Sequence, residues 1–212
     1  MSQLTGLVFV IDDDISIQYA LRSLIRSIGL QVELFGSARD FLHRKAPEMP
    51  ACMILDIRLP GISGLDLQRH LVEARNRIPI IFVTGQGDIA MSVRAMKAGA
   101  VDFLTKPFHD QELLDAVVHA IEQDHVRRQR DVETEGLKES FRSLSPRERD
   151  VLNGVVSGLL NKQVAAEIGT TEATVKFHRG QLMRKMNAQS VPDLVRMASE
   201  LGISVARLGY LS

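Results

Sequence analysis

Five short, mostly apolar runs most constrain what this chain of 212 residues can fold into. Three are Leu7–Ile11, Met53–Leu55 and Ile78–Val83, and the other two, Val32–Phe35, which alternates, and Val101–Leu104, each contain one acid. Runs of this length that end in polar or turn residues are typical of strands buried on both faces of a parallel sheet. The segments between them carry apolar residues at helical spacing, as at Leu21, Leu24 and Ile28. This alternation predicts a doubly wound α/β fold with a five-stranded parallel sheet.

Reactive side chains stand where four of these runs end. Asp12 and Asp13 follow the first run, Asp56 the third, Thr84 the fourth and Lys106 the fifth. Because the carboxyl ends of parallel strands meet at one edge of a sheet, we expect these side chains to lie together in a crevice there. An acid after a strand is often only a helix cap, but the whole set, in this order, indicates a functional site.

The chemistry of this set fits phosphoryl transfer. Carboxylates in one crevice repel one another, and their hard oxygen atoms suit Mg²⁺ or Mn²⁺. A cation bound by Asp13 and Asp56 would leave one oxygen of Asp56 free to attack a phosphoryl donor. Thr84 would donate a hydrogen bond to the new phosphoryl group, and Lys106 would offset its charge. Positioning and charge neutralisation are most of such catalysis, so no general base is needed.

Residues 1–124 resemble the receiver domain of two-component response regulators, which has a flavodoxin/CheY-like fold. The resemblance rests on Val-Ile-Asp-Asp-Asp, Leu-Asp-Ile-Arg-Leu-Pro-Gly, Val-Thr-Gly, Met-Lys-Ala-Gly-Ala-Val-Asp-Phe and Thr-Lys-Pro-Phe. It implies that a histidine kinase phosphorylates Asp56. It also implies that Mg²⁺ lies among Asp12, Asp13, Asp56 and the main-chain carbonyl of Arg58.

The same resemblance implies a switch beside the phosphoacceptor. Thr84 and Lys106 would contact the phosphoryl group, and Phe103 would be the aromatic switch residue that rotates into the space that Thr84 vacates. Arg58 and Gln86 stand where the family tunes the lifetime of the acyl phosphate.

The rotation of Phe103 would reshape the face made by the fourth helix and the fifth strand. In the resembling subfamily this face forms a symmetric dimer on phosphorylation. The candidate residues here are Met91, Val93, Lys97 and Asp102. For Met91 and Val93, ordinary packing in the core is the alternative.

The two halves of the chain differ in charge, although the formal net charge is zero. Residues 1–124 carry 12 Lys and Arg against 16 Asp and Glu, whereas residues 125–212 carry 14 against 10. We therefore expect only the second half to meet a polyanion. Residues 125–140 are highly charged and nearly free of apolar side chains. They predict a helical extension of the receiver that becomes a linker near Glu133–Gly136.

Residues 141–212 have the pattern of a small all-α domain with four helices. Capping boxes at 145–148 and 190–193 are expected to begin the first and fourth helices. Asn161 is expected to cap a short second helix, and Thr170 or Thr171 a third. A short helix, a glycine turn and a polar third helix are the layout of a helix-turn-helix, which places the third helix in the major groove of DNA.

Basic residues gather on the elements that this motif presents to DNA. Lys162, Arg179 and Lys185 are the expected phosphate contacts, which position a protein without reading the sequence. Thr171 and the adjacent helix N-terminus are expected to bind another phosphate through main-chain amides.

The same segment resembles the LuxR-type helix-turn-helix. The matching stretches are Leu-Ser-Pro-Arg-Glu, Gly-Leu-Leu-Asn-Lys-Gln-Val-Ala and Thr-Val-Lys-Phe-His-Arg. The resemblance implies that Lys176, Phe177 and Gly180 read the bases, and Thr174 is a further DNA-binding candidate. His178 is either a core residue or a phosphate contact. Val195 and Arg196, on the fourth helix, are candidates for a dimer contact on DNA.

The whole chain therefore resembles a response regulator of the FixJ/NarL type, a transcription factor rather than an enzyme. Its only chemistry would be its own phosphorylation from a donor and slow dephosphorylation. The expected partners are a sensor histidine kinase, double-stranded promoter DNA and, on phosphorylation, a second copy of the chain; RNA polymerase is a further candidate. No apolar run reaches the ~18 residues of a membrane span, and the first residues lack the pattern of a signal peptide, which predicts a cytoplasmic protein.

Two alternatives stay open at this point. An aspartyl-phosphate hydrolase would need a second acid two residues after its nucleophile, where this chain has Arg58. A regulator that works through protein contacts alone would have no use for a complete acid pocket.

Overall fold

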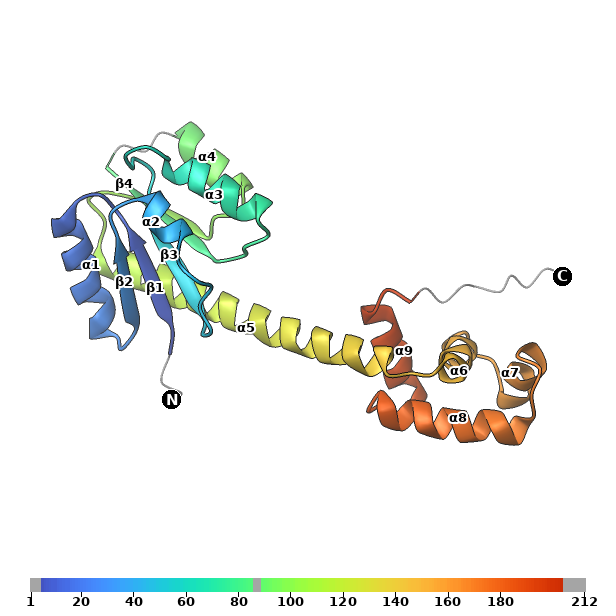
Figure 1. Ribbon diagram of the computed structural model, residues 1–212. Coiled ribbons are helices and arrows are strands. Elements are labelled where there is room, and N and C mark those ends of the chain that lie inside the picture. The colour runs from blue at the N-terminus through green and yellow to red at the C-terminus, as the bar shows by residue number, and fades with distance from the viewer. Residues whose placement is uncertain (1–4, 86–88, 204–212) are drawn as a thin grey trace. The chain divides into compact units, whose positions relative to one another are not determined.

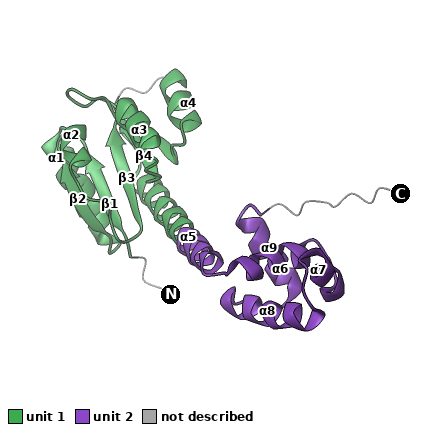
Figure 2. Ribbon diagram, turned by 45° about the vertical axis from the view of Figure 1, so that its right-hand side comes forward, with its two compact units in different colours: residues 1–128 green, residues 129–212 purple. Residues whose placement is uncertain are grey.

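The computed structural model describes residues 5–85 and 89–203. The chain divides into two compact units, residues 1–128 and 129–212 (Figure 2). The division falls inside the segment 125–140 that the sequence assigns to the connection between the domains.

The first unit contains a parallel sheet, with helices on both faces (Figure 1). Its strands are β1 (Leu7–Ile11), β2 (Gln31–Phe35), β3 (Ala51–Asp56), β4 (Ile80–Thr84) and β5 (Asp102–Thr105). Among the described residues they form a 5-stranded sheet in the order β2-β1-β3-β4-β5. The strand order reverses at β1, so a crevice opens at the carboxyl ends of β1 and β3. The predicted fold class is confirmed.

Alternate residues of the buried strands pack into two separate cores. Phe9 and Ile11 face one core with α2 and α3, whereas Val8 and Val10 face the other with α1 and α5. The helices of this unit are α1 (Ile15–Ser27), α2 (Ala38–Leu42), α3 (Gly64–Glu73), α4 (Ile89–Lys97) and the first part of α5 (Asp110–Arg142). Because both faces are covered, polar chemistry has room only where the strands end.

The register of the sheet brings those ends together. Ile11 pairs with Leu55, so Asp12 and Asp56 leave β1 and β3 side by side. Thr84 of β4 pairs with Thr105 of β5, so Lys106, the next residue, leaves β5 beside the end of β4.

The long helix α5 differs from the prediction. We expected a linker near Glu133–Gly136, but α5 continues to Arg142, so that prediction was wrong. Glu135 bonds to the side chains of Lys138 and Arg142, at 3.2 and 3.1 Å. These pairs lie along the helix, and Leu137 and Phe141 on the same turns pack against the core of the second unit. A charged composition thus encodes a solvated helix here rather than a loop.

The second unit consists of helices around a small core. They are α6 (Pro146–Val156), α7 (Asn161–Glu167), α8 (Glu172–Lys185) and α9 (Val191–Glu200), with the end of α5. Val151, Leu182 and Leu194 are fully buried at its centre, and Leu137 and Phe141 of α5 pack against this core. None of the helices in the described ranges is long and apolar enough to cross a membrane.

The helix starts of this unit agree with the sequence except at α7, although the capping box predicted for α9 is incomplete. Ser190 caps α9, but the Asp193 side chain accepts from the N–H of Gln189 rather than from that of Ser190. Ser145 and Glu148 form the expected capping box of α6, and Thr171 caps α8. Asn161 was expected to cap α7 but is its first helical residue, after Leu160. The Asn161 side chain instead accepts a hydrogen bond from Arg179 of α8, at 2.9 Å.

The continuous course of α5 can be tested at Gly136, which lies in the helix with open space around the position of a Cβ. In a helix, Gly136→Ala should raise the free energy of unfolding by about 0.5–1 kcal/mol, and Gly136→Pro should lower it by about 3 kcal/mol. Urea titration followed by circular dichroism measures both. In a loop the proline variant would be neutral or more stable, and that result would contradict the continuous helix.

Candidate functional site

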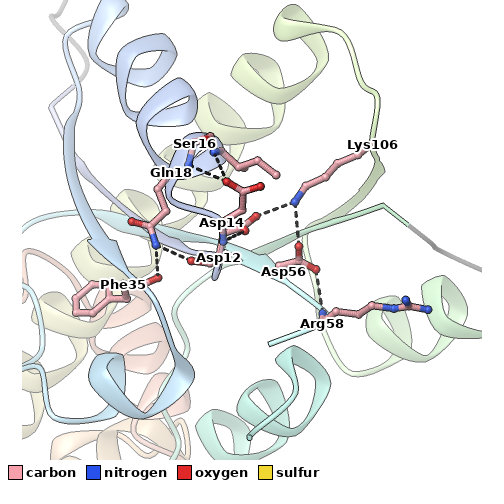
Figure 3. Close-up of polar contacts among 9 residues, drawn as sticks. Asp12, Asp14, Ser16, Gln18, Phe35, Asp56, Arg58 and Lys106 are labelled. Carbon is pink, nitrogen blue, oxygen red and sulfur yellow. Dashed lines mark hydrogen bonds and ion pairs between the residues drawn. The ribbon is translucent and has the colours of Figure 1, made fainter. Parts of the chain in front are cut away.

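One ammonium group joins two acids at the carboxyl edge of the sheet (Figure 3). Lys106 Nζ donates to Asp12 Oδ2 at 2.7 Å and to Asp56 Oδ2 at 2.9 Å. Asp56 is only 8% exposed, and Asp12 is buried as well. A buried carboxylate without a partner is too costly to keep, so Lys106 is the partner that offsets the burial of both acids.

The pocket remains electronegative despite this lysine. Burial by itself lowers the pKa of Lys106, but hydrogen bonds and charges from Asp12 and Asp56 outweigh burial and raise this pKa above its usual value. Lys106 therefore stays protonated at neutral pH. One ammonium against two carboxylates leaves a negative charge, and exposed Asp13 stands beside them in the chain.

Main-chain amides hold each carboxylate in place. Asp56 Oδ1 accepts from the N–H of Arg58 at 2.9 Å, and Asp12 Oδ1 accepts from the N–H of Asp14 at 2.9 Å. The Asp14 side chain in turn caps α1 and accepts from the N–H groups of Ser16 and Ile17. The three acids between β1 and α1, residues 12–14, form the acid loop, which is thus fixed to the start of α1.

The predicted metal ligands supply the right chemistry for Mg²⁺ or Mn²⁺. The carboxylates of Asp12, Asp13 and Asp56 and the carbonyl of Arg58 are hard oxygen donors, which these cations prefer. Across residues 5–85 and 89–203, no three acidic, His or Cys side chains are grouped closely enough to hold a metal by themselves. The donor set still fits Mg²⁺, because this ion keeps several waters and needs few protein ligands.

The other predicted receiver residues lie after β3, at the end of β4 and on β5. Thr84 is fully buried at the end of β4, and its carbonyl accepts from the N–H of Lys106 at 2.8 Å. Phe103 is partly buried with its ring 6.4 Å from that of Phe82. The Arg58 residue is exposed, and Gln86 lies outside the described residues.

The predicted dimer face is only partly at the surface. Met91 packs against the core, Asp102 is partly buried, and Val93 and Lys97 are exposed. The sequence reasoning passed over Ile89, 84% exposed, and Met96, 45% exposed. Ile89, Val93 and Met96 lie at i, i+4 and i+7, so they share one apolar face of α4, and this spacing is the signal that identifies them.

Gly64, at the start of α3, touches the main chain of Asp56. A Cβ at this position would stand 2.3 Å from the Asp56 carbonyl oxygen. The N–H of Gly64 also donates to the carbonyl of Ile57, at 2.9 Å. A glycine is required for α3 to begin this close to the end of β3.

The exposed face of α8 carries the predicted base-reading residues. Lys176, Phe177 and Gly180 are exposed, on the side opposite Val175 and Leu182 of the core. Phe177 is 62% exposed, which is unusual for a ring that only packs. The Gly180 position has nothing within 4 Å of where a Cβ would stand.

The predicted phosphate contacts differ in the hydrogen bonds that their side chains make to other residues of the domain. Lys162 is exposed, whereas Arg179 donates to Asn161. Lys185 Nζ donates to Glu148 Oε2 at 2.7 Å and to the carbonyl of Ser143 at 3.2 Å. Burial raises the pKa of Glu148, but hydrogen bonds from Lys185 and from the cap of α6 outweigh burial and lower it below its usual value. The contact between Lys185 and Glu148 therefore belongs to the packing of this domain.

The remaining predictions for this domain fall on cap and surface positions. Thr171 Oγ1 accepts from the N–H of Thr174 at 3.2 Å and lies 2.9 Å from its hydroxyl. His178 is partly buried, with its ring centroid 5.5 Å from that of Phe177. Val195 packs partly against the core, and Arg196 pairs with Asp193 and Glu200 within α9.

Comparison with known proteins assigns each unit to a family. The response regulator receiver domain model matches residues 8–118, and the model for bacterial regulatory proteins of the luxR family matches residues 142–198. Nodulation protein W of Bradyrhizobium diazoefficiens is 57% identical over 199 residues, which are 94% of this chain and 88% of that protein.

Two further matches span both units. The response regulator protein TodT of Pseudomonas putida is 49% identical over 201 residues, which are 95% of this chain and 88% of TodT. The solved structure of the response regulator StyR matches with a TM-score of 0.84 at 46% identity, over 92% of this chain and 98% of that one.

The contact between Gly64 and Asp56 can be tested by adding one methyl group. Gly64→Ala should lower the free energy of unfolding by about 1–3 kcal/mol, because a clash with main-chain atoms cannot relax by side-chain rotation. Gly85→Ala is the matched control, since Gly85 follows β4 and has nothing within 4 Å of a Cβ. Urea titration compares the two. Equal stabilities would show that α3 does not press on Asp56.

Proposed function

This chain belongs to the response regulators that join a receiver domain to a LuxR-type DNA-binding domain, and we propose that it is phosphorylated on Asp56. It is a transcriptional regulator of a two-component system, and a sensor kinase is the partner that a receiver domain implies. The observation that carries the proposal is the position of Asp56, which is buried at the end of β3 with Lys106 Nζ at 2.9 Å.

The residues of the acid pocket divide the work of phosphoryl transfer. An oxygen of the Asp56 side chain forms a bond to phosphorus as the bond between phosphorus and the donor histidine breaks, and the histidine nitrogen keeps the electron pair of that bond. Asp12, Asp13, Asp56 and the carbonyl of Arg58 would hold Mg²⁺ or Mn²⁺, which would supply charge neutralisation when bound. Lys106, already beside Asp56, pairs with a phosphoryl oxygen after transfer.

The phosphoryl group then changes the neighbouring strand ends. The Thr84 hydroxyl turns to donate to it, and Phe103 moves into the space that becomes free. Arg58 and Gln86 set how long the acyl phosphate lasts. The residue two after Asp56 is Arg58 rather than an acid, so the chain lacks the acid that an aspartyl-phosphate hydrolase needs at this position, and slow dephosphorylation is the only turnover.

The second unit binds the major groove through α8. Lys176, Phe177 and Gly180 face the base edges, and Lys162 and the Thr171 end of α8 contact phosphates. Thr174 supports that end of the helix. Arg179 and Lys185 act through their partners Asn161 and Glu148, which fix α8 in the domain, so their contribution to DNA binding is orientation.

Phosphorylation makes the protein dimeric in this proposal. Two receivers pair through the face of α4 and β5, which contains Val93, Lys97 and Asp102, with Met91 beneath it. Two copies of α8 then reach half-sites about 34 Å apart on promoter DNA. RNA polymerase is a candidate partner of the DNA-bound dimer. We expect the protein to bind promoter DNA in the cytoplasm.

The phosphorylation site can be tested by labelling. With acetyl phosphate and Mg²⁺, intact-protein mass spectrometry should detect one phosphoryl group on wild type and on the control Asp115→Asn, and none on Asp56→Asn. Removal of Mg²⁺ with EDTA should abolish labelling. Treated wild type should bind promoter DNA more tightly than Asp56→Asn. Labelling of Asp56→Asn as fast as wild type would refute the assignment.

The two kinds of DNA contact can be separated by their salt dependence, on a sequence selected from a random pool. Lys176→Ala should weaken binding to that sequence by about 1–3 kcal/mol and leave binding to unrelated DNA nearly unchanged. Lys162→Ala should weaken both equally and reduce the slope of log affinity against log salt by about 1. Fluorescence anisotropy measures the affinity of wild type and of both variants for the selected sequence and for unrelated DNA. The opposite pattern would reverse the assignment of the two lysines.

A further inference from the structure

We infer that Gln18, a residue outside the phosphorylation chemistry, is the positioning residue that holds Asp12 as a metal ligand. The inference rests on the proposed function, because it assigns Gln18 a part in the same acid pocket. Gln18 lies on α1 and is only 8% exposed, although glutamine is usually found at the surface.

The Gln18 side chain joins the ends of two strands (Figure 3). Its Nε2 donates to the main-chain carbonyl of Asp12 at 2.6 Å, and to that of Phe35 at 3.2 Å. The N–H of Asp12 donates to the same Phe35 carbonyl, at 3.2 Å. One amide group therefore fixes the point where β1 ends beside β2.

These contacts matter because of what else holds Asp12. Its Oδ1 accepts from the N–H of Asp14, and its Oδ2 accepts from Lys106. Lys106 is the partner that leaves when it pairs with a phosphoryl group, and a cation takes over part of the Asp12 carboxylate. The main-chain bonds to Gln18 and Phe35 do not take part in that exchange, so they keep Asp12 oriented throughout it.

The chemistry of the position favours glutamine over other side chains. A primary amide has two N–H donors, and both are directed at carbonyl oxygens here. Methionine has a similar length but no donor, so it would leave the carbonyl of Asp12 without this partner. Asparagine keeps the amide but is one methylene shorter. Residues that orient the ligands of a metal typically change its affinity by about 10- to 100-fold when they are replaced.

A role in packing alone makes a different prediction, and Gln68 provides the matched control. Gln68 is also buried, at 2% exposure, on a helix of the same unit, and its Nε2 donates to the carbonyl of Ala95 at 3.1 Å. It serves α3 and α4 and makes no bond to the acid loop. Both Gln18→Met and Gln68→Met remove a buried amide, so both should lose stability by similar amounts.

The deciding measurement is the binding of Mn²⁺ to the full-length protein. We expect isothermal titration calorimetry to give a Kd about 10- to 100-fold weaker for Gln18→Met than for wild type, and an unchanged Kd for Gln68→Met. Gln18→Asn should fall between wild type and Gln18→Met. Circular dichroism and urea titration, run in parallel, report how much stability each variant has lost.

Each outcome bears on one claim. Equal Mn²⁺ affinity for wild type and a folded Gln18→Met overturns the inference, and so does equal weakening in Gln18→Met and Gln68→Met. If neither Gln18 variant folds, the residue is structural and the inference is also wrong. If wild type itself binds no Mn²⁺ and is not labelled by acetyl phosphate, the proposed function fails instead.

Discussion

The bridge that Lys106 makes between Asp12 and Asp56 is the interaction on which the first unit depends. It brings together residues from the ends of β1, β3 and β5, and without the ammonium two buried carboxylates would face each other unpaired. The same contact holds the carboxylate of Asp56, the proposed phosphoacceptor, at the edge of the sheet. One lysine therefore both stabilises this edge and positions the proposed site.

The rest of the first unit follows from the need to serve that edge. Alternate residues of β1 and β3 fill two apolar cores, which leaves only the strand ends for charged groups. Gly64 lets α3 start against Asp56, and Gln18 ties the acid loop to β2. Gly64 thus fixes the main chain at Asp56, and Gln18 fixes the main chain at Asp12.

Much of this arrangement could be predicted from the sequence, because charges that interrupt apolar runs are conspicuous. Asp56 and Lys106 stand out after mostly apolar runs, and parallel topology forces their strand ends to one edge. Gln18 could not be found in this way. It lies among polar residues of an amphipathic helix, where a buried amide has the same pattern as a solvated one.

The second unit shows a similar limit. Helix caps and the apolar stripe gave its layout, but the basic residues of α8 were indistinguishable until their partners were known. Lys185 proved to be tied to Glu148, and Arg179 to Asn161, through contacts between residues far apart in the chain. The continuous course of α5 was missed for the same reason, since Leu137 and Phe141 pack against a core that local composition does not reveal.

The open position at Gly180 has a consequence for how such a regulator can change over time. No neighbour restricts a side chain at this point of α8, so a longer one would extend from the helix face proposed to bind DNA without disturbing the core. Recognition and folding are thus separable at this residue. A duplicated copy could acquire a new set of promoters through a single codon while its receiver, and the signal it answers to, stayed as they were.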